Sequence, residues 1–274
     1  MLGQSHKDLW RFGGELSYST LLVTDDGGVR TITLNRPERR NAMTPEMQLE
    51  LISAMKDAAA SDCRLVVLAG AGESFCSGLD LTVLQEMKDK TGVEYREDAE
   101  RIAKLFRTLY ELPKPTIAAV HGAAIAGGTG LAMICDFTLA SPAAKFGFTE
   151  VRIGFVPALV SAFLALQLGD KRSRDLLLTG RLFDAAEAHQ LGLVNDVVAP
   201  EDLEMRVNAL ATLLAANSPQ SMGATKRLLA AQNKAWLDVA IAEAMEANAQ
   251  ARDTEDFREG VTSFLEKRKA VWTK

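Results

Sequence analysis

A run of small residues from His121 to Asp136 constrains the fold of this chain more than any other segment. It reads HGAAIAGGTGLAMICD and follows an apolar segment, 116–120, that is typical of a buried strand. Because its glycines lead into a small-residue helix from about Gly128, the run predicts a strand, a loop and a helix in succession. Backbone N–H groups at such a helix start suit a phosphate or an oxygen that becomes negative during a reaction.

The loop does not match either of two common nucleotide-binding motifs. Gly122 and Gly127 have the spacing of a phosphate-binding P-loop, with Thr129 at its Thr position, but Gly128 stands where that motif requires Lys. The dinucleotide fingerprint G-x-G-x-x-G is not present in the loop. Two interpretations of the glycines therefore remain, which are tight packing of the strand on the helix and binding of an oxyanion. Oxyanion binding also needs a second N–H donor and a titratable group.

Composition narrows the function classes. The 274 residues are 47% hydrophobic and 24% charged, which is ordinary for a globular protein, and the net charge of −5 argues against nucleic acid as the main partner. No run has the length of a membrane span, and residues 1–15 lack the pattern of a targeting segment, so we expect a cytoplasmic protein. Cys63, Cys76 and Cys135 show neither metal nor disulfide spacing and are expected as reduced core thiols, with no metal bound.

Short apolar strands alternate with helices through the first part of the chain, which predicts βαβ units around a mostly parallel sheet. The strands are expected at 21–24, 29–34, 65–70, 116–120, 137–140 and 145–147, and the helices at 45–60, 99–111 and near 161–168. The first of these helices is expected to begin with Thr44 as its N-cap and Pro45 in its first turn. The charged segment 88–98 is expected to be a mobile surface segment. From about Asp170 the pattern is nearly all helical, with a capped helix from Asp184 to Gly192, a start at Ser218, and two last helices near 236–250 and 255–270.

Two further segments supply candidate chemistry. Ser77 and Gly78 follow a strand closely, as Gly127 does, and the carboxyl ends of parallel strands gather at one edge of a sheet, so a second N–H donor is expected there. Glu150 lies in an otherwise apolar stretch, where burial raises the pKa of a carboxyl and lets it exchange protons near neutrality. An ordinary turn at Ser77 and a salt bridge from Glu150 to Arg152 are the structural alternatives.

Over roughly residues 18–273 the chain resembles the crotonase (enoyl-CoA hydratase/isomerase) superfamily. Beside the glycine loop and the segment before Glu150, the matching motifs are NRPERRNAM at 35–43, FCSGLDL at 75–81, PKPTIAAVHG at 113–122 and FLEKRK at 264–269. The resemblance implies an α/β fold with a spiral β/α core and a C-terminal helical trimerisation region. It divides the chain into a flexible lead-in at 1–15, a core with the acyl-CoA site at 16–200, and the helical region at 201–274.

The resemblance also implies the site. The substrate is an acyl-CoA thioester, no separate cofactor is required because CoA is part of the substrate, and the assembly is a homotrimer or a dimer of trimers. The backbone N–H groups of Ser77 and Gly127 are similar to the oxyanion hole of the family, and Glu150 to a catalytic glutamate. The substrate-binding positions implied in this way are Arg39, Arg40, Asn41, Ala42, Ser77, Gly78, Leu79, Asp80, Gly127, Gly130, Phe264 and Lys267.

One departure from the family pattern leaves alternatives open. Typical hydratases of the family carry a second catalytic glutamate, and its position is Gly130 here. We expect a hydratase-like enzyme that adds water to a 2-enoyl-CoA with a single glutamate; a Δ3,Δ2-enoyl-CoA isomerase and a low-activity acyl-CoA binding protein are the alternatives. The segment 150–161 also resembles relatives that hydrate branched or carboxylated enoyl-CoAs, in which case Arg152 would meet a second carboxylate of the substrate.

Overall fold

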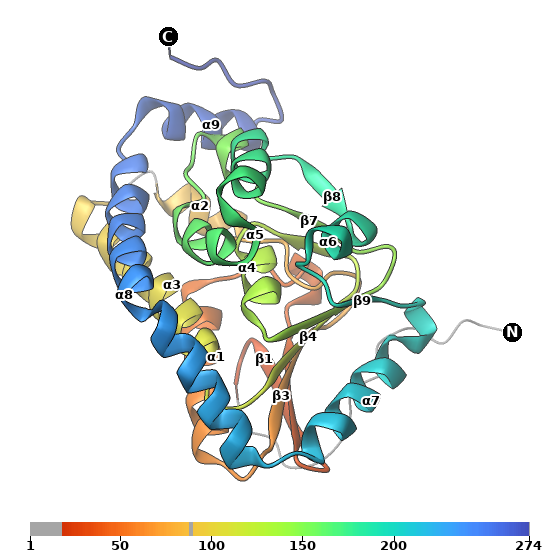
Figure 1. Ribbon diagram of the computed structural model, residues 1–274. Coiled ribbons are helices and arrows are strands. Elements are labelled where there is room, and N and C mark those ends of the chain that lie inside the picture. The colour runs from red at the N-terminus through yellow and green to blue at the C-terminus, as the bar shows by residue number, and fades with distance from the viewer. Residues whose placement is uncertain (1–17, 88–89, 274) are drawn as a thin grey trace, which may run out of the picture.

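A six-stranded sheet forms the centre of the molecule in the computed structural model, which describes residues 18–87 and 90–273 (Figure 1). The expected lead-in at 1–15 lies outside the described residues. The strand order is β1-β2-β3-β4-β6-β9, and every neighbouring pair is parallel except the β1–β2 hairpin. The strands are β1 (Leu21–Asp26), β2 (Val29–Leu34), β3 (Leu65–Gly70), β4 (Thr116–Val120), β6 (Phe137–Ala140) and β9 (Asp196–Val197).

A smaller sheet of three strands, in the order β5-β7-β8, stands beside the main one. Its members are β5 (Ala123–Ile125), β7 (Lys145–Gly147) and β8 (Leu182–Asp184). Sequence analysis did not expect β5, because its three residues belong to the glycine run and have no strand pattern of their own. The strand forms because β7 pairs with it in parallel.

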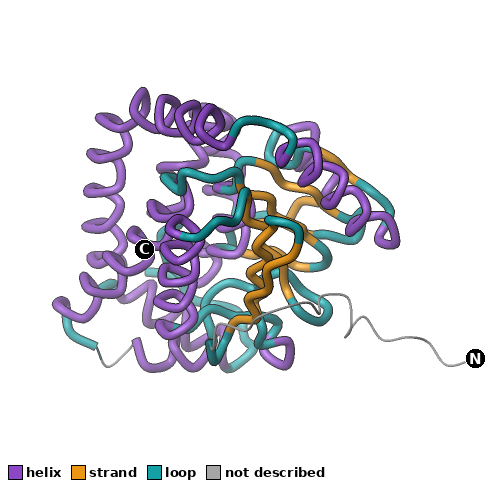
Figure 2. The backbone as a smooth tube through the Cα atoms, turned by 90° about the horizontal axis from the view of Figure 1, so that it is seen from below, coloured by secondary structure: helices purple, strands orange, loops and turns teal. Residues whose placement is uncertain are grey.

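Helices cover both faces of the main sheet, and this confirms the expected α/β class (Figure 2). The alternation of side chains along β3 decides which residue faces which layer. Leu65, Val67 and Ala69 pack with α7 (Leu203–Ala215), whereas Val66 and Leu68 join the larger core under the opposite helices. The remaining helices are α1 (Pro45–Ala60), α2 (Leu81–Glu86), α3 (Gly92–Tyr110), α4 (Gly127–Ile134), α5 (Ala158–Thr179), α6 (Ala185–Leu191), α8 (Pro219–Ala251) and α9 (Glu255–Leu265), with 3₁₀ turns η2 (Pro37–Arg39), η4 (Glu150–Ile153) and η5 (Pro200–Asp202).

Local capping signals placed several helix starts correctly. The Thr44 hydroxyl accepts a hydrogen bond from the Met47 N–H at 3.2 Å, with Pro45 as the first residue of α1. Asp184 caps α6 by accepting from the Glu187 N–H at 2.9 Å, and Gly192 ends that helix in the left-handed conformation. These contacts lie within one turn of the chain, which is why the sequence alone predicts them.

The prediction of a mobile surface segment at 88–98 is wrong from Gly92 onward, because helix α3 begins at that residue. Lys88 and Asp89 lie outside the described residues. Glu94 accepts a hydrogen bond from the Thr91 N–H at 2.8 Å and so fixes the helix start. Asp98 is buried at the end of this charged segment, since cationic side chains surround it.

The C-terminal region holds one long helix where the sequence suggested two. Helix α8 runs without interruption from Pro219 to Ala251, through the expected boundary near residue 236, because no proline stands inside it to break it. Within the described residues, no helix is both long enough and apolar enough to cross a bilayer. The three cysteines are buried and free, as expected.

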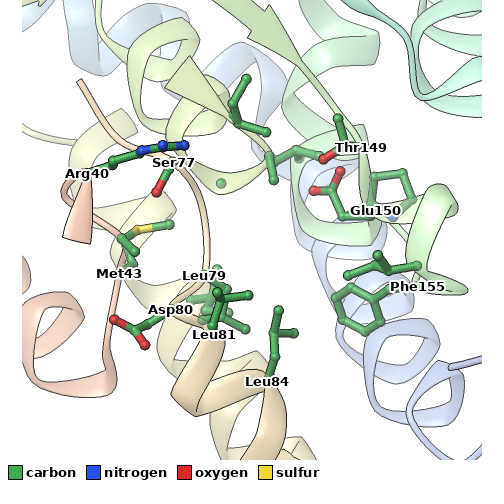
Figure 3. A pocket seen from close by; sticks show the side chains of 18 of the residues that line it. Arg40, Met43, Ser77, Leu79, Asp80, Leu81, Leu84, Thr149, Glu150 and Phe155 are labelled. Carbon is green, nitrogen blue, oxygen red and sulfur yellow. The ribbon is translucent and has the colours of Figure 1, made fainter. Parts of the chain in front are cut away.

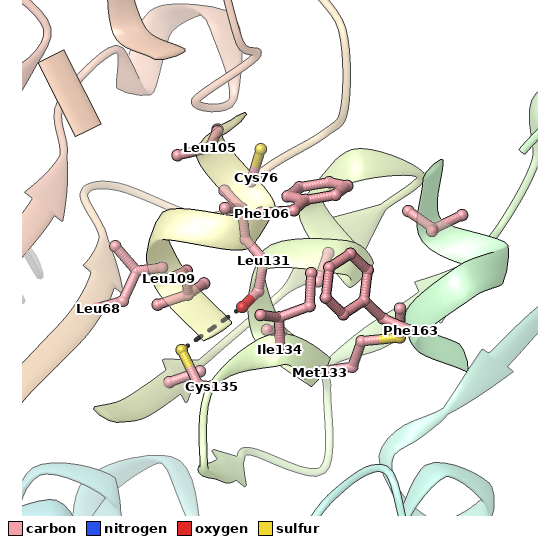
Figure 4. Close-up of a cluster of buried hydrophobic side chains, with 14 of the residues drawn as sticks. Leu68, Cys76, Leu105, Phe106, Leu109, Leu131, Met133, Ile134, Cys135 and Phe163 are labelled. Carbon is pink, nitrogen blue, oxygen red and sulfur yellow. Dashed lines mark hydrogen bonds between the residues drawn. The ribbon is translucent and has the colours of Figure 1, made fainter. Parts of the chain in front are cut away.

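The largest apolar core lies where α3, α4 and α5 meet (Figure 4). Phe106 of α3 packs edge-on against Phe163 of α5, with ring centroids 6.1 Å apart, beside Leu131 and Ile134 of α4. Because α4 consists of small and aliphatic residues, both neighbouring helices approach it closely. This packing holds the start of α4, and therefore the glycine loop, in place.

Candidate active site

A pocket of about 940 Å³ lies between the glycine loop, the loops after β2 and β3, the turn η4, and the C-terminal helices (Figure 3). Segments far apart in the sequence build its walls, and Glu150 lies across it from Ser77 and Met43. Most of the predicted site residues line it: Arg39, Arg40, Ala42, Ser77, Leu79, Asp80, Gly127, Glu150 and Phe264.

Close backbone contacts fix the loop after β3 against the glycine loop. The Ile125 N–H donates to the Cys76 carbonyl at 2.9 Å, and the Cys76 N–H donates to the carbonyl of Ala123 at 3.0 Å. A Cβ atom on Gly128 would lie 2.2 Å from the Cys76 carbonyl oxygen, so only glycine permits this approach. The two loops that sequence analysis treated separately are therefore one rigid unit.

The expected oxyanion donor at Ser77 needs a correction. The Ser77 N–H donates to the Arg40 carbonyl oxygen at 3.1 Å, so this hydrogen is already engaged. Residue 79 is placed differently, because the Gly78 carbonyl accepts from Met43 N–H at 2.7 Å and the Asp80 N–H donates to the Met43 carbonyl at 3.0 Å. With both neighbours facing Met43, the Leu79 N–H faces away from it, and it has no hydrogen-bond acceptor among the described residues.

The N–H of Gly127, which the sequence predicts as a donor, is also without a backbone acceptor among the described residues. Gly127 is the first residue of α4, so its N–H has no carbonyl one turn earlier in the helix to bind. The preceding residue, Ala126, has φ 53° and ψ −119°, a conformation that is strained for any residue with a Cβ. Ala126 is held there because its own N–H donates to the Gly147 carbonyl at 2.7 Å.

Glu150 supplies the titratable group. Its Oε2 atom is buried and has no hydrogen-bond partner among the described residues, although part of the side chain reaches the pocket. Burial raises the pKa of Glu150 to about 7. The carboxyl group can therefore both accept and donate a proton near neutral pH.

The alternative of a salt bridge from Glu150 to Arg152 is wrong. Arg152 is exposed, and within residues 18–87 and 90–273 it makes no ion pair with Glu150. Arg152 also lines the pocket, but its stem packs beside Gly180, where an added Cβ would lie 3.3 Å from its Cγ. Glu150 is thus left without a countercharge, which explains the direction of its pKa shift.

Gly130 lies beneath the pocket rather than on its wall. A Cβ atom there would lie 2.8 Å from Val160 Cγ1 and 2.9 Å from Phe106 Cζ, and both of these side chains are buried and line the pocket. The space of a second glutamate is therefore filled by apolar groups.

Three other predicted residues also lie off the pocket wall. The Asn41 side chain is buried and donates to the carbonyls of Ala71 and Ser74, both at 2.8 Å, so it shapes the loop rather than contacting a ligand. Gly78 and Lys267 do not line the pocket either. Asp80 does, but its carboxylate accepts from the Thr82 N–H at 2.9 Å and caps α2.

The wall also holds polar residues that the sequence did not indicate, and two of them, Asn248 and Arg252, come from the C-terminal helices. Both lie at the C-terminal end of α8, more than 90 residues from Glu150 in the chain. No local motif marks them. A buried arginine can be recognised only after the helices have been packed.

The fold and the pocket define an α/β protein whose site combines two backbone N–H groups with a buried carboxyl group of raised pKa. The family model described as "Enoyl-CoA hydratase/isomerase" matches residues 24–274. The chain therefore belongs to the enoyl-CoA hydratase/isomerase family and is an enzyme of that family, as expected.

Similar proteins support the same assignment. A putative enoyl-CoA hydratase of Thermus thermophilus is 43% identical over 249 residues, covering 90% of this chain and 98% of that protein. A short-chain-enoyl-CoA hydratase of Clostridium acetobutylicum is 34% identical, covering 93% of this chain and 97% of its own. The crystal structure of an enoyl-CoA hydratase/isomerase from Xanthobacter autotrophicus Py2 matches with a TM-score of 0.85 and 31% identity, covering 94% of this chain and 100% of that one. These hydratase names fit the lyase class.

Proposed function

We propose that this protein adds water to the double bond of a 2-enoyl-CoA thioester, or removes it in reverse. The observation that carries the proposal is the Glu150 carboxyl group, which is unpaired, has a pKa of about 7, and shares a pocket with the N–H groups of Leu79 and Gly127. The hydratase names of several relatives support this reaction.

The two N–H groups would bind the thioester carbonyl oxygen. Attack on C3 of the enoyl group moves charge onto this oxygen and produces an enolate, which the Leu79 and Gly127 N–H groups stabilise from fixed positions. Removing one such donor typically costs about 3 kcal/mol of transition-state stabilisation. The proposed pair replaces Ser77 with Leu79.

Glu150 would perform both proton transfers. Its ionised form takes a proton from water as the hydroxyl adds to C3, and the resulting carboxylic acid gives that proton to C2 of the enolate. One group can serve as base and then as acid because its pKa lies near neutrality. The apolar wall of Phe106 and Val160 above Gly130 offers no second proton carrier.

The mouth of the pocket suits the CoA part of the substrate. Arg39 and Arg40 are exposed there and are placed to pair with CoA phosphates, and the half-exposed ring of Phe264 lines the pocket at the start of the C-terminal tail. The proposed reaction needs no separate cofactor. We also propose assembly as a homotrimer or a dimer of trimers, on the family resemblance alone.

A second candidate is a Δ3,Δ2-enoyl-CoA isomerase, which the single carboxyl group favours. Moving a double bond needs one base that takes a proton from C2 or C4 and returns it to the other carbon. Glu150 and the two N–H donors would suffice for this reaction as well.

The discriminating experiment uses crotonyl-CoA and 3-hexenoyl-CoA in deuterated water, with products identified by mass spectrometry. A 3-hydroxyacyl-CoA carrying deuterium at C2 supports the hydratase. A shifted double bond without added water supports the isomerase. Tight binding of both thioesters without any turnover would contradict both and favour an acyl-CoA binding protein. The Glu150→Gln variant is the control, because it keeps the shape of the side chain and removes the proton carrier.

A further inference from the structure

Two polar side chains at the α8 end of the pocket have no part in the reaction described above. Arg252 ends α8, and its side chain is fully buried yet lines the pocket. Asn248 precedes it by one helical turn, so both side chains lie on the same face of the helix. The Oδ1 atom of Asn248 and the Nε and Nη2 atoms of Arg252 are buried and without hydrogen-bond partners among the described residues.

One edge of the Arg252 guanidinium has no hydrogen-bond acceptor among the described residues. The rings of Tyr95 and Phe155 lie 5.5 and 5.4 Å from the guanidinium carbon. The Nη1 atom donates to the Tyr95 carbonyl at 3.4 Å and to the Asp98 carboxylate at 3.3 Å. What remains is the edge formed by Nε and Nη2.

This edge is the one that binds a carboxylate in two parallel hydrogen bonds. The protein contains such a pair elsewhere, where Arg30 donates from Nε and Nη2 to the two oxygens of Asp25 at 2.7 and 2.6 Å. A buried donor without an acceptor destabilises the folded protein, so two of them on one edge indicate a place for an external acceptor.

The charges around Arg252 also favour an anion. Within the described part of the chain, Asp98 is the carboxylate paired with three cations, Lys90, Arg101 and Arg252. One negative charge does not neutralise three positive ones, and Arg252 is the member of this group that lines the pocket. A flip of the Asn248 side-chain amide exchanges the positions of Oδ1 and Nδ2, so this residue can also offer an N–H donor to an anion.

A continuous wall joins this edge to the reacting centre. The Phe155 N–H donates to the Glu150 carbonyl at 3.0 Å, so both residues belong to one tight turn. The Phe155 side chain then covers the Arg252 guanidinium, and Leu84 and Ile102 add apolar contacts on the same pocket. Because Leu79, Gly127, Glu150 and Arg252 all line this pocket, an acyl chain whose thioester binds at Leu79 and Gly127 would extend past Glu150 toward Arg252.

We propose that Arg252, with Asn248, binds a carboxylate at the far end of the acyl chain, so that the substrate is a 2-enoyl-CoA with a terminal carboxylate. This inference rests on the proposed function, because it assumes that the pocket takes an acyl-CoA. It assigns to the buried Arg252 the role that the sequence suggested for Arg152, which also lines the pocket but has an exposed side chain.

Binding measurements test the proposal without any turnover. Isothermal titration compares the saturated CoA monothioesters of linear C5 to C8 dicarboxylic acids with the thioesters of monocarboxylic acids of equal length. At the length that reaches Arg252, we expect the carboxylated ligand to bind roughly 10- to 100-fold more tightly, as charged hydrogen bonds to a buried group do. Equal binding at every length overturns the proposal.

The Arg252→Gln variant removes the charge while keeping a polar side chain, and it should abolish the preference for the carboxylated ligand. Arg101→Gln is the matched control, because Arg101 pairs with the same Asp98 but does not line the pocket. This variant should retain the preference. A preference that survives in Arg252→Gln, or disappears equally in Arg101→Gln, assigns the cluster to folding alone and contradicts the proposal.

If circular dichroism shows that the Arg252→Gln variant does not fold, the Asn248→Asp variant is used to test the proposal instead. The added carboxylate repels an anionic ligand, so the affinity for the carboxylated thioester should fall at least tenfold more than that for its uncharged counterpart. An equal loss for both ligands overturns the proposal.

The outcomes also separate this proposal from the proposed function. Preferential binding of the carboxylated thioester without hydration of its 2-enoyl form supports the Arg252 site and contradicts the hydratase. Hydration of crotonyl-CoA without any preference for a terminal carboxylate supports the hydratase and contradicts the Arg252 site.

Discussion

Two regions of the molecule hold a buried carboxyl group, one on the pocket wall and one behind it, and their pKa shifts have opposite directions. Glu150, on the turn η4, has a pKa raised to about 7 by burial. Burial acts on Asp98 of α3 in the same direction, but hydrogen bonds and charges from Lys90 and Arg101 outweigh it, so the pKa of Asp98 lies below its ordinary value. The chemistry of the two side chains is the same, and their neighbours differ.

This difference separates a reactive group from a structural one. Asp98 stays ionised because cations surround it, and it connects α3 to α8 through Arg252. Glu150 forms no ion pair among the described residues that would stabilise its ionised form. Its protonation state therefore changes in the pH range where an acid–base catalyst operates. A carboxyl group whose charge can change near neutral pH therefore lines the pocket, and a carboxylate with a fixed charge lies behind it.

The largest expected effect comes from removing the carboxyl group of Glu150. We expect Glu150→Gln to lower kcat for enoyl-CoA hydration by about 10³-fold, since general acid–base catalysis typically contributes 10²–10⁴-fold. Steady-state kinetics with crotonyl-CoA measure this loss. The variant should still bind the saturated thioester butyryl-CoA, and turnover within tenfold of the natural protein would remove Glu150 from the mechanism.

A substitution at Asp98 should lower the stability of the folded protein. Replacing Asp98 by Asn leaves buried Arg252 without its carboxylate, and we expect a loss of about 3 kcal/mol in the free energy of unfolding. Urea denaturation followed by circular dichroism measures it.

Asp238→Asn is the matched control for this prediction. Asp238 also accepts from two cations, Arg107 and Lys234, each at 2.6 Å, but its side chain is 42% exposed, against 6% for Asp98. Water screens that cluster, so its loss should be much smaller. Equal losses for the two variants would show that burial does not distinguish these clusters.

The pH dependence of stability should expose the Glu150 shift. Its pKa is about 7 in the folded protein and has an ordinary value of 4.5, so ionising it costs folding free energy as the pH rises between these values. Above pH 7 Glu150→Gln should be more stable than the natural protein by about 2 kcal/mol, because the pocket's water reduces the full linkage value. At pH 4 the two should unfold alike, and a constant difference across pH 4–8 would contradict the shift.

The smallest effect is expected at Arg152. Because this side chain is exposed and makes no ion pair with Glu150 in the described structure, Arg152→Gln should change the free energy of unfolding by less than about 0.5 kcal/mol. The acidic limb of the kcat/KM profile should keep its pKa near that of the natural protein. A rise of that pKa would mean that Arg152 acts on Glu150 after all.

Sequence reasoning succeeded where the deciding contacts are local. The boundaries of β2, β3 and β4 and the caps at Thr44 and Asp184 were predicted correctly, since each depends on a short pattern or on residues within one turn. It failed at α3, where the charged first turns resemble a surface segment until the burial of Asp98 is known.

The sequence by itself determined the α/β class, the glycine loop with the Gly127 donor, Glu150 as the titratable group, and the absence of a glutamate at position 130. Only the tertiary structure decided that the Leu79 N–H is open while Ser77 binds Arg40, that Arg152 leaves Glu150 unpaired, and that Arg252 faces the pocket. Residue type and short spacing fix local conformation. Hydrogen-bond direction and burial arise from segments that meet only when the chain has folded, because they depend on which groups exclude water from one another.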